Sequence, residues 1–376
     1  MDAYETLRLI WWALLGVLLI GFAVMDGFDL GTAALLPFVA KSDIERRVAI
    51  NTVGPVWEGN QVWFILGGGA IFAAWPALYA ASFSGFYLAM FLVLATLILR
   101  PAGFKFRGKI EDPRWKRFWD WALFSGGVVP ALVFGVAFGN LFEGVPFSFD
   151  DDLRFHSTIT LLSLLNPFAL LCGVISLSMI VLHGACWLNL KTEGAVKARA
   201  AAVIPYAALL YMLLFALAGF WLAQLPGFAI SSPPVHGGAS NPMLKTVALA
   251  HGGWFSNFRS QPALWAIVAL AYLGAAAATV FRRRPILAFC GSAFVVASTV
   301  ATAGVALFPF LLPSSDNPAM SLTVWDASSS KLTLAIMLGA VVLILPIVLA
   351  YTTFVYYVLR GPVKPETITD DPHTSY

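Results

Sequence analysis

Long apolar runs, free or nearly free of charge, recur along the whole sequence. A helix needs roughly 20 consecutive apolar residues to cross the ~30 Å hydrocarbon core of a bilayer. Runs of this kind lie at 9–35, 61–76, 79–100, 119–142, 159–188, 202–224, 263–281, 286–312 and 333–359. The pattern predicts an all-α integral membrane protein with about nine transmembrane helices, forming a single polytopic membrane domain over residues 1–376.

The run at 61–76 is the weakest of the nine, because it is short and carries three consecutive glycines. The uncharged stretch 61–99 nevertheless contains 39 residues, which as one continuous helix would be about 58 Å long. That length crosses a bilayer twice, and the Trp75-Pro76 pair offers a natural turn between the two crossings.

Basic residues are distributed unequally between the loops that nine spans would create. Of the 23 Lys and Arg residues, 18 fall on the side of the C-terminus and 5 on the side of the N-terminus. The positive-inside rule then predicts a periplasmic N-terminus and a cytoplasmic C-terminus. Eight spans, without 61–76, would divide the same residues 16 to 7, which is a weaker bias.

Composition supports lipid as the main solvent of the chain. The sequence is 59% hydrophobic and 11% charged, whereas soluble domains carry about 25% charged residues. The net charge is only +3, and no basic stretch is interleaved with aromatics as a nucleic-acid surface requires. No Walker loop, nucleophile elbow or Cys/His metal spacing occurs, so the sequence indicates neither a hydrolase nor a metal site in this chain.

Two carboxylates, Asp26 and Asp29, lie late in the first run, three residues apart and hence on one helical face. A carboxylate at membrane depth is expensive and normally faces the bundle interior or a partner. Gly27 and Gly31 would let another helix approach this segment closely. We interpret the pair as a proton-relay or partner-binding face; the alternative is a hydrated pair near the inner membrane interface.

Glu58 begins the second run, in a polar segment flanked by Trp57 and Trp63. A glutamate in the first helical turn suits the helix dipole, which would be a purely structural role. A carboxylate at this place could equally form a proton port on the cytoplasmic side. The residues alone do not choose between these two interpretations.

Three further polar residues are candidates for structural roles. Arg100 ends the third run, where it could snorkel to water, and Asp120 begins the fourth among tryptophans typical of a membrane interface. Because Arg100, Asp120 and Glu58 share the cytoplasmic level, an Arg100–Asp120 or Arg100–Glu58 ion pair is a further hypothesis. His183 lies well inside a predicted span, but no helical pair of histidines accompanies it, so we interpret it as a packed side chain rather than a haem ligand.

Several segments together resemble subunit II of cytochrome bd-type ubiquinol oxidases. They are GFAVMDGFD at 21–29, WEGNQVW at 57–63, FAAWP at 72–76, SGFY at 84–87, RP at 100–101, FGN at 138–140, LFPF at 307–310 and SLTVWDASSS at 321–330. The ordered combination covers nearly the whole chain and is very specific.

The resemblance implies a haem-free second subunit of a terminal quinol oxidase in the bacterial cytoplasmic (inner) membrane. Subunit I of that family holds the b- and d-type haems and the quinol site, and the complex reduces dioxygen to water with cytoplasmic protons. Subunit II has a similar helical fold, two four-helix bundles plus a peripheral helix, and is needed for the assembled enzyme. Glu58 matches the family's acidic position on a cytoplasmic proton route, which also favours a role for Asp26 and Asp29.

One departure and some open points accompany the resemblance. Many relatives have a histidine just before the Trp–acid pair, where this chain has Val56. Some relatives hold a structural quinone in this subunit, and a small single-span accessory subunit is a further expected partner; no residue pattern assigns either here. A polytopic secondary transporter and a purely structural scaffold subunit remain the alternative functions.

The charge bias yields a test of topology. A reporter fused after Tyr376 should be active in the cytoplasm, and one fused before Met1 should be active in the periplasm. Reporters that place both termini on one side of the membrane would contradict nine spans and favour eight.

Overall fold

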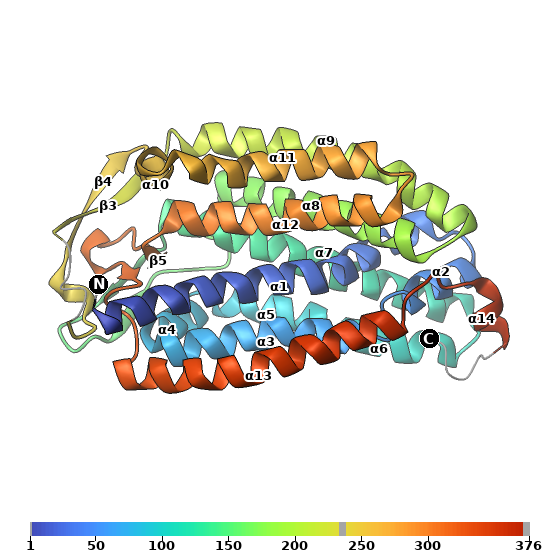
Figure 1. Ribbon diagram of the computed structural model, residues 1–376, viewed down its shortest axis with the longest axis horizontal. Helices are drawn as coiled ribbons and strands as arrows, with labels where there is room; N and C mark the ends of the chain where they lie inside the picture. Colours follow the sequence, from blue (N-terminus) through green and yellow to red (C-terminus); the bar gives the residue numbers. More distant parts are fainter. Residues whose placement is uncertain (1, 233–237, 371–376) are drawn as a thin grey trace.

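The computed structural model describes residues 2–232 and 238–370 and consists of long, roughly parallel or antiparallel helices (Figure 1). The long helices are α1 (Ala3–Val39), α3 (Trp57–Ala74), α7 (Pro113–Glu143), α8 (Pro167–Lys191), α9 (Gly194–Leu222), α11 (Trp265–Val280), α12 (Pro285–Leu307) and α13 (Lys331–Val358). Shorter helices are α2 (Asp43–Asn51), α4 (Pro76–Gly85), α5 (Tyr87–Leu97), α6 (Leu99–Phe106), α10 (Ser256–Ser260) and α14 (Pro365–Asp370). The prediction of an all-α membrane protein is confirmed.

Within the described residues, eight helical segments are long and apolar enough to cross a membrane. Helix α3 is not among them, because its first turn contains Glu58, Asn60 and Gln61. It nevertheless has 18 residues and packs along α1. The start of α1 and helix α14 lie at opposite ends of the bundle (Figure 1), as an odd number of crossings requires.

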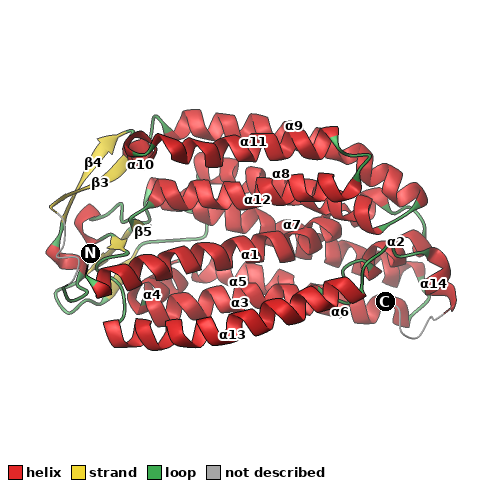
Figure 2. Cartoon of the chain, viewed as in Figure 1, coloured by secondary structure: helices red, strands yellow, loops and turns green. Residues whose placement is uncertain are grey.

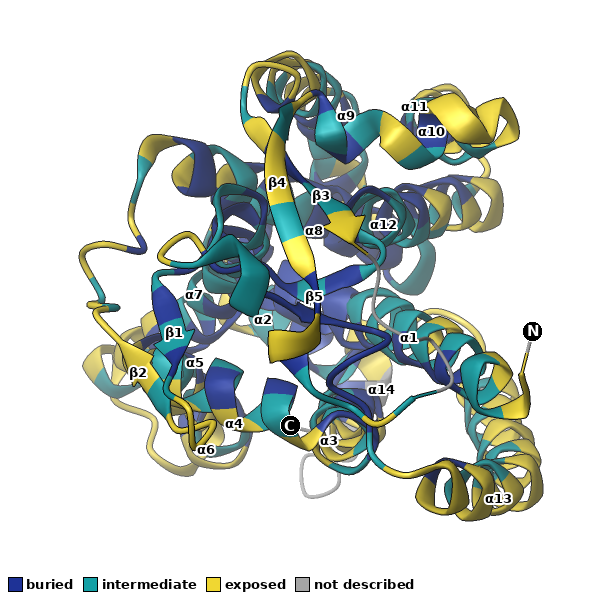
Figure 3. Cartoon of the chain, turned by 90° about the vertical axis from the view of Figure 1, so that its left-hand side faces the viewer, coloured by how far each residue is buried: buried dark blue, intermediate teal, exposed yellow. Residues whose placement is uncertain are grey.

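The helices form the predicted two four-helix bundles and a peripheral helix. The first bundle contains α1, α3, the α4–α6 segment and α7; the second contains α8, α9, α11 and α12, and the two meet where α8 packs on α1 and α7. Helix α13 lies at the margin and consists mostly of exposed residues (Figure 3); Leu334 is its one buried residue.

The predicted third span is broken into three helices. Trp75 interrupts the chain between α3 and α4, and Pro76 begins α4. A second interruption lies at Phe86 and a third at Ile98. Pro101 has no N–H to donate to the carbonyl one turn earlier, which explains the third break. The interruption at Ile98 is slight, since its backbone stays right-handed helical at φ −64° and ψ −19°, and residues Tyr87–Lys109 form one candidate membrane span.

Two predicted spans include residues that are not helical. The span predicted from 159 begins at Pro167, because the Asn166 side chain accepts a hydrogen bond from the Ala169 N–H and caps the helix there. The span predicted to end at 312 ends at Leu307, because Pro309 cannot continue a helix.

Short strands gather at one end of the bundle (Figure 2). Within the described residues they form three antiparallel pairs: β1 (Phe147–Phe149) with β2 (Phe155–Ser157), β3 (Pro226–Ser232) with β4 (Thr246–His251), and β5 (Phe310–Leu312) with β6 (Leu322–Thr323). They hold the long loops of the predicted periplasmic side against the helix ends.

The contact between α1 and α8 depends on glycine. A Cβ atom on Gly184 would lie 2.6 Å from the Cα atom of Gly31 and 2.7 Å from the Thr32 nitrogen, closer than real contacts allow. A Cβ atom on Gly31 would likewise lie 2.8 Å from Gly184 Cα. Small residues therefore bring the two bundles into backbone contact.

Gly184→Ala should destabilise the detergent-solubilised protein by about 1–3 kcal/mol, because the added methyl group forces the two backbones apart. Gly16→Ala is the matched control, since a Cβ atom there meets nothing within 4 Å. Thermal unfolding midpoints compare the two variants. Equal midpoints for Gly184→Ala and the unaltered protein would contradict the close packing.

Candidate functional site

A buried ion cluster lies inside the first bundle. Arg100 on α6 donates two hydrogen bonds to Asp26 on α1, from Nη1 to Oδ2 at 2.9 Å and from Nη2 to Oδ1 at 2.7 Å. Oδ2 of Asp29 lies 3.6 Å from the same Nη2. All three side chains are fully buried. The structure thus brings together the two predicted carboxylates and adds a shared cation.

This arrangement corrects our expectations for Arg100. The side chain does not snorkel to water, and within the described residues its ion pairs are with Asp26 and Asp29 rather than with Asp120 or Glu58. Arg100 lies in the first turn of α6, directly before Pro101. A Cβ atom on Gly126 of α7 would lie 3.0 Å from Arg100 Cγ, so that glycine leaves room for the arginine stem.

Two neutral side chains extend the cluster from other helices. Asn60 on α3 donates from Nδ2 to Oδ2 of Asp29 at 2.9 Å, and the Tyr356 hydroxyl on α13 donates to Oδ1 of Asn60 at 2.7 Å. Tyr356 is 296 positions from Asn60 in the sequence. No local pattern in the sequence could have linked it to this site.

Glu58 is not part of the buried cluster. Its side chain is exposed in the first turn of α3, although Asn60, two residues later, is buried. Val62 and Ile65 lie on the same helical face and are 44% and 67% exposed. Glu58 therefore ends an apolar strip that faces lipid or a partner.

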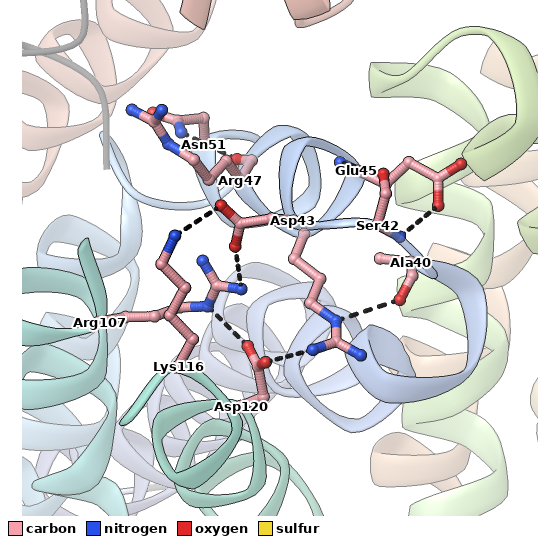
Figure 4. A network of polar contacts seen from close by, with 10 residues as sticks. Ala40, Ser42, Asp43, Glu45, Arg47, Asn51, Arg107, Lys116 and Asp120 are labelled. Atoms are coloured by element: carbon pink, nitrogen blue, oxygen red, sulfur yellow. Dashed lines mark hydrogen bonds and ion pairs between the residues drawn. The ribbon is translucent and has the colours of Figure 1, made fainter. Parts of the chain in front are cut away.

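Asp120 belongs to a second network, at the predicted cytoplasmic end (Figure 4). Its carboxylate is buried. It accepts hydrogen bonds at 2.6 Å from both Arg107 Nε and Arg46 Nη1. Arg107 also donates to Asp43 at 2.8 Å, and Lys116 donates to Asp43 at 2.9 Å. The network ties α2 to the α6–α7 connection.

The pKa of Asp43 is lowered in this network. Burial alone would raise it, but the hydrogen bond from Lys116 and the charge of Arg107 outweigh burial. A depressed folded-state pKa means that this stabilisation is complete above the unfolded value of about 3.9. It is lost as the pH falls through the lower folded-state value.

A third set of charged side chains, a buried ion pair, lies at the opposite end of the molecule. Lys245 pairs with Asp326 at 2.9 Å, and both side chains are buried. Burial lowers the pKa of Lys245, and the Asp326 carboxylate offsets part of that shift. Asp326 also accepts a hydrogen bond from the Thr323 N–H at 2.8 Å. The pair joins two long loops, and sequence reasoning did not anticipate it.

His183 is buried between three helices. Its Nδ1 lies 2.8 Å from Ser292 Oγ on α12, and its Nε2 lies 2.9 Å from the Val24 carbonyl oxygen on α1. The ring stacks on Phe289 at 4.9 Å between centroids. Both ring nitrogens thus have protein partners. Across residues 2–232 and 238–370, no group of three His, Cys, Asp or Glu side chains is arranged to hold a metal ion.

An apolar cavity of about 570 Å³ lies at the junction of the two bundles. Aromatic side chains from both bundles line it, among them Phe22, Phe134, Phe215 and Tyr272. Such a space suits an apolar chain rather than a charged ligand.

Known proteins resemble this chain over its full length. The sequence profile of a family described as "Cytochrome bd terminal oxidase subunit II" matches residues 7–359. The "Probable cytochrome oxidase subunit 2" of Haemophilus influenzae is 51% identical, and the "Cytochrome bd-I ubiquinol oxidase subunit 2" of Escherichia coli is 48% identical, each over 100% of both chains. A chain in the structure of bd oxidase from Geobacillus thermodenitrificans has the same fold, with a TM-score of 0.68 at 15% identity, covering 94% of this chain and 99% of that chain.

Proposed function

The chain belongs to the cytochrome bd terminal oxidase subunit II family, as its motifs predicted, and we propose that it is the haem-free second subunit of such an oxidase. It is a multi-pass protein of the bacterial inner membrane and a subunit of an oxidoreductase complex. Its partner is the oxidase subunit I, which in our proposal carries the b- and d-type haems. The engaged ring nitrogens of His183 support this division, because an axial haem ligand needs a free nitrogen.

The second part of the proposal is that this subunit supplies part of a cytoplasmic proton route. Reduction of dioxygen to water consumes protons, and protons cross hydrocarbon only along carboxylates, polar side chains and water. Asp26 and Asp29 are the carboxylates at depth, and Glu58 is the carboxylate at the expected cytoplasmic end of α3. The observation that carries the proposal is the chain of contacts from Asn60 to Asp29 and Arg100 in the apolar core.

Glu58 would join this route at the interface with the partner. Its exposed side chain ends an apolar strip, and a carboxylate facing lipid would be costly. Subunit I would cover Glu58 and connect it to the route. Val56 is buried and cannot carry a proton, so Glu58 would receive protons from water or from another polar group.

The apolar cavity supports a further component, a structural quinone or its isoprenoid tail. Its volume and aromatic lining suit such a chain, whereas no charged side chain lines it. A transporter function has no comparable support. A purely structural role would predict that replacing the Glu58 carboxylate does not slow oxygen uptake, whereas our proposal predicts that it does.

Glu58→Gln should slow quinol-driven oxygen uptake by the purified, haem-loaded complex by about tenfold or more, because an amide can hydrogen-bond but cannot release a proton. Glu58→Asp should keep much of the activity. Glu111→Gln, in the exposed α6–α7 connection, is the control for removing one cytoplasmic-side charge. Wild-type uptake by Glu58→Gln across the pH range would remove Glu58 from the proton route and leave a scaffold.

A further inference from the structure

The buried cluster contains two carboxylates but one cation. When Asp26 and Asp29 are both ionised, Arg100 leaves a net charge of −1 in side chains that are fully buried. A net charge in an apolar interior is strongly unfavourable, and the usual response of such a site is to keep a proton. Charge balance therefore requires one proton on the pair.

Within residues 2–232 and 238–370, no second cation is paired with either carboxylate. Asn60 on α3 and Tyr356 on α13 are neutral, and α7 faces Arg100 with Gly126. His183 on α8 is directed to the Val24 carbonyl and Ser292. Arg107 in the α6–α7 connection is bound to Asp43 and Asp120, and Lys116 at the start of α7 is bound to Asp43.

The contacts distinguish the two carboxylates. Asp26 accepts hydrogen bonds from both N–H groups of the guanidinium fork, a bidentate charge-assisted pair. Asp29 receives one neutral amide hydrogen, from Asn60, and lies 3.6 Å from the guanidinium. Among the described residues, Asp29 Oδ1 is buried without a hydrogen-bond partner. An unpaired charged oxygen is more costly to bury than a neutral carboxyl group.

We propose that Asp26, Asp29 and Arg100 hold one exchangeable proton, and that Asp29 carries it. The inference rests on the proposed proton route and assigns its storage point. Tyr356 and Asn60 are positioning residues, since the hydroxyl fixes the amide and the amide fixes Asp29. Thr32 lies one turn further along the same stripe of α1, and its hydroxyl is buried without a partner in the described chain. Asp26, Asp29 and Thr32 thus form a row of polar side chains on one face of α1 that runs toward the Asp43–Asp120 network.

Infrared spectroscopy of the purified, haem-loaded complex tests the proposal without relying on turnover. A protonated carboxyl has a C=O stretching band distinct from that of a carboxylate, and the band shifts in D₂O. We expect Asp29→Asn to lose this band. Asp26→Asn should lose it as well, because Arg100 then balances the one remaining carboxylate and no proton is needed. Tyr356→Phe should shift the band, because the amide bound to Asp29 loses its own donor.

Isotope labelling keeps the test valid if Asp29→Asn does not assemble. In the unaltered complex with ¹³C-labelled aspartate, the carboxyl band should move to lower frequency, which assigns it to aspartate. A carboxyl spectrum that is unchanged in assembled Asp29→Asn, or that does not respond to labelled aspartate, would overturn the proposal.

Oxygen uptake separates this inference from the proposed route. If Asp29→Asn loses the band but keeps wild-type uptake, Asp29 stores a proton and the route through it is wrong. If the unaltered complex has no aspartate carboxyl band and Asp29→Asn still slows uptake, the stored proton is wrong and the route stands.

Discussion

The first bundle is organised around the interaction of one guanidinium group with two carboxylates in an apolar interior. Removing three ionisable side chains from water is tolerated only when their charges and hydrogen bonds are nearly satisfied. Two local features serve this requirement: Gly126 leaves space for the Arg100 stem, and Asn60 provides an amide for Asp29. Helices α1, α3, α6 and α13 are joined through these contacts.

The two ends of the molecule use charge differently from its centre. At the predicted cytoplasmic end, Asp120 and Asp43 bind three basic side chains near water, where such pairs tie short helices together. At the other end, the buried Lys245–Asp326 pair fastens two long loops. Of these three groups of charged side chains in the described residues, the central cluster alone combines deep burial with an excess of carboxylates. The cluster holds the helices of the first bundle together, and its excess of carboxylates favours the binding of a proton.

The sequence predicted the class of fold because lipid imposes a simple rule of length and apolarity on every span. Asp26 and Asp29 were predicted to act together because a spacing of three residues determines a shared helical face. The partner of Arg100 could not be predicted from its level in the membrane, because tertiary packing brings α6 to Asp26, which is 74 positions away in the sequence. Tyr356 was missed because tertiary packing alone brings α13 to Asn60.

The ends of the helices, too, were predicted only in part from the sequence. The Asn166 cap explains why α8 begins at Pro167, and Pro309 explains why α12 ends at Leu307. The average apolarity of residues 159–166 and 308–312 is high, so a search for apolar runs overlooks the asparagine and the proline. The loop strands depend on long-range pairing. Family motifs supplied the function, which neither composition nor helix periodicity contains.

A double-mutant cycle on Arg100 and Asp26 tests most directly whether the cluster is one charge-compensated unit. Arg100→Gln alone should destabilise the purified complex by about 3–5 kcal/mol, because it leaves buried carboxylates without their cation. Combining Arg100→Gln with Asp26→Asn should recover more than about 1 kcal/mol relative to the sum of the single changes, since the double variant removes both charges. Strictly additive losses in the thermal unfolding of the four proteins would contradict this account.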